Sequence, residues 1–167
     1  GLFNPAFVEQ DELEYLSIAK SLLDGSYDLM AGTNTRRTIV FPAFLAVLLK
    51  LFGGIYGAQI AISVVNALSA PLLVLIVERL SNARLPALLA GLALACWPPA
   101  VFFGNSLYSE SLALPAFLLA LCLCPTGNSN KDARLWQFAV SGLVLGITVH
   151  IRPMYLLFIP FLLAIII

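Results

Sequence analysis

The sequence predicts an all-α protein: a polytopic transmembrane helix bundle with amphipathic juxtamembrane helices in its first extracytoplasmic loop. Hydrophobic residues make up 60% of the chain and charged residues 11%, against about 45–50% and about 25% in soluble domains. Too little polar surface therefore exists to cover a water-soluble globule. Apolar runs also follow one another from Ile39 to Ile167, whereas a soluble fold of this length alternates apolar with polar residues.

The polar segment 1–54 is expected to form the extracytoplasmic loop with its amphipathic and interfacial helices. After Asp11, apolar residues recur at helical spacing, and Gly25 stands where a helix end needs a residue that tolerates positive φ. This predicts a surface helix from about Glu12 to Asp24. The apolar positions that carry the pattern are Leu13, Leu16, Ala19, Leu22 and Leu23.

The next run, Ile39 to Phe52, contains Pro42 and Lys50 and ends at Gly53 and Gly54. It is shorter than the ~20 apolar residues that a membrane crossing needs. We expect an interfacial or re-entrant helix here.

Segment 55–167 is expected to be the transmembrane bundle, with about five hydrophobic spans. The last span stops without a flanking anchor, and the chain starts in a polar segment, so both ends look cut from a longer protein. Within the fourth span, Gly142 and Gly146 form a G-x-x-x-G pattern that lets helix backbones approach closely. The expected spans are Tyr56–Val77, Leu85–Phe103, Leu107–Cys124, Leu135–Ile151 and Met154–Ile167.

Basic residues in the connecting loops predict the orientation. Loops 78–84 and 125–134 carry lysine or arginine, whereas the turn 104–110 carries none. The positive-inside rule places the first two loops in the cytoplasm. The N-terminal segment, the turn before Glu110 and the turn at 150–153 then share the extracytoplasmic side.

Composition also excludes some functions. The net charge is zero and the basic residues are scattered, which argues against a nucleic-acid partner. Cys96, Cys122 and Cys124 lie inside apolar runs without metal-site or redox spacing, and His150 stands alone. We interpret the cysteines as small hydrophobic side chains.

Two adjacent acids are the candidate catalytic residues. Asp11 and Glu12 have the chemistry of a general base, and Asp11 that of a ligand for a divalent metal. No other cofactor is expected. The structural alternative is that Asp11 is a helix N-cap and forms a capping box with Glu14.

The candidate substrate-binding residues lie on the same predicted side. Glu110 begins an apolar run, where it could also complement a helix dipole. Arg152 can hold a phosphate or extend to lipid headgroups, as can the arginines that precede the interfacial helix. Two tyrosines, whose simplest role is that of interface aromatics, complete the group. Besides Glu110 and Arg152, the members are Arg36, Arg37, Tyr15 and Tyr108.

Several segments resemble the GT-C superfamily of integral membrane glycosyltransferases, most closely the branch with protein O-mannosyltransferases and bacterial aminoarabinose transferases. "DELEYLSIAKSLLDGSY" is similar to that family's first extracytoplasmic loop. "TRRTIVFPAFLAVLLKLFG" is similar to its juxtamembrane helix but departs from it at residues 38–41. Asn66, the pair Pro98 and Pro99, "LYSESLALP" and "GLVLGITVHIRP" follow in the family's order.

The resemblance implies that this chain is the N-terminal part of an enzyme of the inner or plasma membrane whose active site faces the extracytoplasmic side. It implies inverting transfer of a sugar from a polyprenyl-phosphate donor to a hydroxyl of a protein or glycolipid. Asp11 would be the base with Glu12 beside it, and Arg152 and Arg37 would stabilise the phosphate leaving group.

Two other classes stay open on the residues alone. One is a non-catalytic membrane transporter or scaffold subunit, in which the acids cap helices and the arginines anchor lipid. A transporter predicts polar residues at mid-span, and the runs offer few beyond Ser63, Asn66 and Ser141. The other class is a ligase or flippase that acts on the same lipid carriers.

Overall fold

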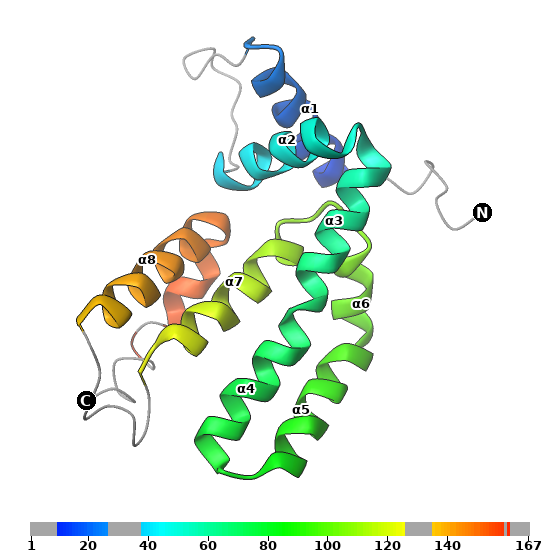
Figure 1. Ribbon diagram of the computed structural model, residues 1–167. Helices are drawn as coiled ribbons and strands as arrows, with labels where there is room; N and C mark the ends of the chain where they lie inside the picture. The colour runs from blue at the N-terminus through cyan, green and yellow to red at the C-terminus, as the bar shows by residue number, and fades with distance from the viewer. Residues whose placement is uncertain (1–9, 27–37, 126–134, 159, 161–167) are drawn as a thin grey trace.

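The computed structural model describes residues 10–26, 38–125, 135–158 and 160 (Figure 1). Throughout these ranges the regular structure is helical and no strand occurs, so the all-α prediction is confirmed. The helices are α1 (Gln10–Leu23), α2 (Val40–Phe52), α3 (Ile55–Ala67), α4 (Ser69–Ser81), α5 (Arg84–Cys96), α6 (Pro98–Gly104), α7 (Glu110–Leu123), α8 (Leu135–Ile151) and the short 3₁₀ helix η3 (Pro153–Phe158).

α1 and α2 pack against each other at one end of the molecule (Figure 1). Of the apolar face that the sequence predicts for α1, Leu16 and Ala19 are buried, whereas Leu13 and Leu23 are exposed. The ring of Tyr15 meets Phe41 edge-on with centroids 4.8 Å apart. Gly25 has φ +66° after the last turn of α1, and Gly53 has φ +70° after α2. Both helices therefore end at the glycines that the sequence indicates.

The predicted N-cap role of Asp11 is wrong. α1 begins at Gln10, which places Asp11 and Glu12 inside the first turn. An N-cap lies before the first helical residue, so Asp11 cannot fill that position. Its charge still complements the positive end of the helix dipole.

α3 and α4 form one long apolar rod, with a tighter turn at Leu68, and α5 returns beside α4. Gly91 of α5 faces α4 so closely that an added Cβ would lie 2.3 Å from Cγ2 of Val74. Only Asn82 and Ala83 connect the two helices. The predicted loop 78–84 is therefore shorter, because Arg79 and Arg84 belong to the helices.

The predicted span Leu85–Phe103 is not one straight helix, because α5 and α6 meet at an angle of 58°. Trp97 takes an extended backbone between them, and Pro98 begins α6. A residue that precedes proline is disfavoured in the α conformation, and proline has no N–H to continue the helix. The apolar run therefore contains a bend between α5 and α6 that hydrophobicity alone does not indicate.

α7 and α8 lie side by side as an antiparallel pair (Figure 1). α8 has the predicted bounds, whereas α7 starts at Glu110 instead of Leu107. Part of the predicted helix Met154–Ile167 lies outside the described residues, and its described beginning is the 3₁₀ helix η3.

The predicted close approach at Gly142 and Gly146 is not found against any described residue. A Cβ added at either glycine would have no atom within 4 Å. These two glycines lie on the exposed face of α8. Among the described glycines, close contacts between helices lie instead at Gly91, which faces Val74, and at Gly104, which faces Asn66.

By length and composition, one described helix is sufficient to cross a membrane: Ile55–Ser81, with 27 residues. The bent pair of α5 and α6 passes the same test if it is taken as one span. α2, α7 and α8 are apolar but shorter, with 13, 14 and 17 residues. That the chain crosses the membrane several times therefore remains a prediction.

Candidate functional site

The start of α7 and the end of α8 meet beneath α1. Because α7 and α8 run antiparallel, Glu110 in the first turn of α7 lies opposite Arg152, which directly follows α8. Nη2 of Arg152 and Oε1 of Glu110 form an ion pair. The dipoles of both helices favour this placement, since an acid lies at an N-terminus and a base at a C-terminus.

Ser109 connects this ion pair to α1. Its hydroxyl accepts hydrogen bonds from the hydroxyl of Tyr15 at 3.3 Å and from Nε of Arg152 at 3.2 Å. It donates its own proton to Oε2 of Glu110 at 3.2 Å. A serine hydroxyl has one donor and two acceptor sites, so Ser109 is saturated. This pattern requires Glu110 to accept, as an ionised carboxylate does.

Glu12 ties α1 to the same turn. Its Oε1 accepts a hydrogen bond from the backbone N–H of Leu107 at 2.7 Å. The Glu12 side chain is only 7% exposed. A buried carboxylate with a short hydrogen bond to the backbone acts as an anchor, and this one fixes the turn that carries Ser109 and Glu110.

Two aromatic residues that were assigned to substrate binding are buried here. Tyr15 is 5% exposed and Tyr108 is 6% exposed. The Tyr108 ring packs edge-on against Phe103 with centroids 5.7 Å apart. The Tyr15 hydroxyl donates to Ser109, so Tyr15 supports the site from α1.

The ion pair itself stays partly open. The Arg152 side chain is 31% exposed and that of Glu110 is 25% exposed. Nη1 of Arg152 has Sδ of Met154 as its neighbour at 3.9 Å. A thioether is a weak acceptor, so this edge of the guanidinium retains capacity to donate to an anionic ligand.

Asp11 is half-buried beside Glu12 on the first turn of α1. Among the described residues, no three His, Cys, Asp or Glu side chains gather as a metal ion would require. The described residues around Asp11 therefore do not form the group of three ligands that a divalent metal site would need. Arg36 and Arg37 lie outside the described residues.

The structure thus brings together Glu12, Tyr15, Glu110 and Arg152, and adds two groups that sequence reasoning missed. These are the hydroxyl of Ser109 and the backbone N–H of Leu107. A serine that precedes an acid and an apolar run is typical of a helix N-cap, but the Ser109 side chain makes no capping hydrogen bond, so this signal does not indicate its role in the site. The backbone N–H carried none.

Comparison with known proteins gives no relative for this arrangement. No family model, no curated protein and no solved structure matches the chain significantly.

Proposed function

We propose that this chain is part of a membrane glycosyltransferase that moves a sugar from a polyprenyl-phosphate donor to an acceptor hydroxyl of a protein or glycolipid. The observation that carries the proposal is the network linking α1 to Glu110 and Arg152 through Ser109. This network holds the acidic first turn of α1 close to the guanidinium of Arg152, a cation that can bind phosphate. Both lie at one end of the α7–α8 pair.

The reaction needs a base and an anion-stabilising group on the two sides of the reacting carbon. Asp11 removes the proton of the acceptor hydroxyl, and the hydroxyl oxygen forms the new bond to the anomeric carbon. The bond from that carbon to the phosphate oxygen breaks, and polyprenyl phosphate leaves with the electron pair. Arg152 stabilises its developing charge, and Arg37 is proposed to assist.

The network gives different tasks to the two adjacent acids. Glu12 is buried and already accepts from Leu107, so we assign it to positioning. Asp11 is more accessible and lies next to it on the same turn, so the role of base falls to Asp11. A general base must reach the substrate proton.

The arrangement in the membrane belongs to the same proposal. The α3–α4 rod and the bent α5–α6 pair have the apolar length of spans, and the site lies at the end of the molecule opposite the α4–α5 turn (Figure 1). We propose that this end faces the extracytoplasmic side of the inner or plasma membrane. A lipid-linked donor then arrives through the bilayer and meets its acceptor at the membrane edge.

The test is a transfer assay with the full-length protein in liposomes. Radiolabelled polyprenyl-phosphate monosaccharides serve as donors, and a serine- and threonine-containing peptide or a glycolipid serves as acceptor. Asp11→Asn is expected to lower the transfer rate at least about 100-fold, the usual contribution of a general base. Arg152→Met should lower it as well, because a methionine cannot hold a phosphate.

Asp24→Asn is the matched control, because Asp24 is an exposed acid at the other end of α1. It should transfer at the wild-type rate. Equal rates for Asp11→Asn and wild type would show that the base is wrongly assigned. The absence of transfer from every donor by the wild-type protein would refute the function itself.

A further inference from the structure

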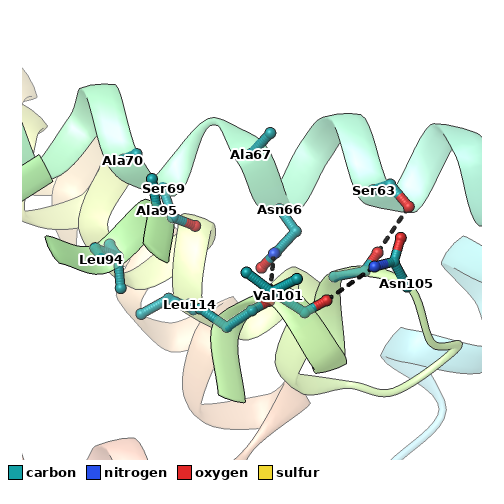
Figure 2. A pocket seen from close by; sticks show the side chains of 12 residues that line it. Ser63, Asn66, Ala67, Ser69, Ala70, Leu94, Ala95, Val101, Asn105 and Leu114 are labelled. Carbon is teal, nitrogen blue, oxygen red and sulfur yellow. Dashed lines mark hydrogen bonds between the residues drawn. The ribbon is translucent and has the colours of Figure 1, made fainter. Parts of the chain in front are cut away.

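A pocket of about 240 Å³ lies between α3–α4 on one side and α5, α6 and α7 on the other. Figure 2 shows that polar side chains enter it from the α3–α4 junction and from the end of α6, while apolar side chains such as Leu94 and Leu114 form the opposite wall. The pocket lies away from the Glu110–Arg152 pair, and nothing in the proposed transfer reaction uses it.

Ser69 holds an unused hydroxyl in this pocket. The residue is 3% exposed, and its Oγ has no hydrogen-bond partner among the described residues. A helical serine often bonds to the carbonyl one turn earlier. Ser69 makes no such bond. Leaving a buried hydroxyl unpaired costs about 1–3 kcal/mol.

Two amides also line the pocket, Asn66 in its middle and Asn105 at the end away from Ser69 (Figure 2). Asn66 donates from Nδ2 to the carbonyl of Ala100 at 3.1 Å, and Asn105 donates from Nδ2 to the carbonyl of Val101 at 3.1 Å. Since a carbonyl can only accept, these bonds fix which end of each amide is the nitrogen. Asn66 approaches this closely because Gly104, with no Cβ, lies opposite it.

Ser63 contributes no free proton, because its hydroxyl already donates to the carbonyls of Gly104 at 2.7 Å and Gln59 at 2.8 Å. The pocket thus offers one free hydroxyl, two amide oxygens and an apolar wall. No ionisable side chain lines it. A charged ligand would therefore lose its hydration without gaining a counter-ion.

We propose that this pocket binds a hydrophobic alcohol. A ligand hydroxyl can donate to the amide oxygen of Asn66 and accept from Ser69, while its hydrocarbon body covers Leu94 and Leu114. The volume is sufficient, since an apolar cavity of about 150 Å³ already binds benzene. An alkane would fill the same space but would leave the Ser69 hydroxyl unpaired.

The test is competition photolabelling of the purified full-length protein in detergent micelles, with a diazirine-bearing octanol and mass spectrometry to locate the label. The label is expected on α4, α5 or α6 and to be saturable. 1-Octanol should displace it at concentrations about fivefold lower than n-octane, the effect of one hydrogen bond of about 1 kcal/mol. Equal displacement by the two competitors would overturn the proposal, as would label found mainly elsewhere.

Ser69→Ala should reduce the difference between octanol and octane while leaving octane displacement unchanged. This variant removes an unpartnered group, so the folded protein is expected to tolerate it. Ser81→Ala is the matched control, because Ser81 is an exposed serine of α4 whose hydroxyl bonds to the carbonyl of Val77. It should discriminate like wild type. A Ser69→Ala protein that still discriminates fivefold would overturn the assignment of Ser69.

Discussion

The carboxylate of Glu12 accepts a hydrogen bond at 2.7 Å from the backbone N–H of Leu107, 95 positions further along the chain. This contact, together with the Tyr15–Ser109 hydrogen bond, joins α1 to the turn before α7. Without it, α1 would be held chiefly by its packing on α2. The buried side chain of Glu12 therefore helps to hold the acidic first turn of α1 in place.

Removal of the Glu12 carboxylate should destabilise the protein. Glu12→Ala leaves the buried N–H of Leu107 unpaired, which we expect to cost about 1–3 kcal/mol of unfolding free energy. Glu12→Gln keeps an oxygen that can accept the hydrogen bond and should cost less. Denaturant unfolding in mild detergent measures both values.

Glu78→Ala is the control for this comparison, because Glu78 is exposed near the end of α4. It should change stability by less than about 0.5 kcal/mol. If Glu12→Ala and Glu78→Ala had equal effects, the contact with Leu107 would not be what anchors α1.

Helix ends set by local chemistry were predictable from the sequence. Gly25 and Gly53 terminate α1 and α2 because each takes a positive φ that other residues avoid. The bounds of α8 follow from one uninterrupted apolar run. Tyr15, Glu110 and Arg152 were candidates, and their convergence required only that α7 and α8 form an antiparallel pair beside α1.

Contacts between segments that lie far apart in the sequence could not be predicted from local patterns. The G-x-x-x-G pattern at Gly142 has no described atom within 4 Å of an added Cβ, whereas the equally spaced small residues Ala87, Gly91 and Ala95 include the glycine that closely approaches Val74. The two patterns look alike in the sequence, so spacing alone does not identify the packed one. The bend at Trp97 had a local signal in Pro98 and Pro99, but hydrophobicity continues through it and favours a single span. The role of the Leu107 N–H could not be found, since any backbone carries the same group.

The Glu110–Arg152 pair should show a modest coupling energy. In a double-mutant cycle with Glu110→Gln and Arg152→Gln, we expect about 1 kcal/mol, because the side chains are 25% and 31% exposed and solvent screens their attraction. The coupling should fall in about 1 M salt, where the screening length is about 3 Å. Strictly additive single-variant effects would show that the pair contributes no net stability.

The packing at Gly91 should make alanine unfavourable there. A Cβ would lie 2.3 Å from Cγ2 of Val74 and 3.1 Å from the carbonyl oxygen of Ala70. Valine is stiff at χ1, so the helices must shift, and we expect Gly91→Ala to cost about 1–3 kcal/mol of unfolding free energy. Val74→Ala should relieve part of that cost in the double variant.

Gly142→Ala is the matched control in α8, where no atom lies within 4 Å of an added Cβ. Alanine forms helix better than glycine by up to about 1 kcal/mol, so this variant should be neutral or stabilising. Equal destabilisation by Gly91→Ala and Gly142→Ala would mean that both glycines face a packed neighbour.

The proposed membrane arrangement predicts which positions react on which side. In a variant whose cysteines at 96, 122 and 124 are replaced by alanine, single cysteines are placed at Ser26, Asn82 and Asn105. Ser26 follows α1, Asn105 follows α6, and Asn82 lies in the α4–α5 turn at the far end of the molecule (Figure 1). An impermeant maleimide should label positions 26 and 105 on intact cells, and position 82 only after permeabilisation. If positions 82 and 105 were both labelled on intact cells, α3–α4 would not cross the membrane. If positions 26 and 105 were labelled from opposite sides, the acidic turn of α1 and the Glu110–Arg152 pair could not share one site.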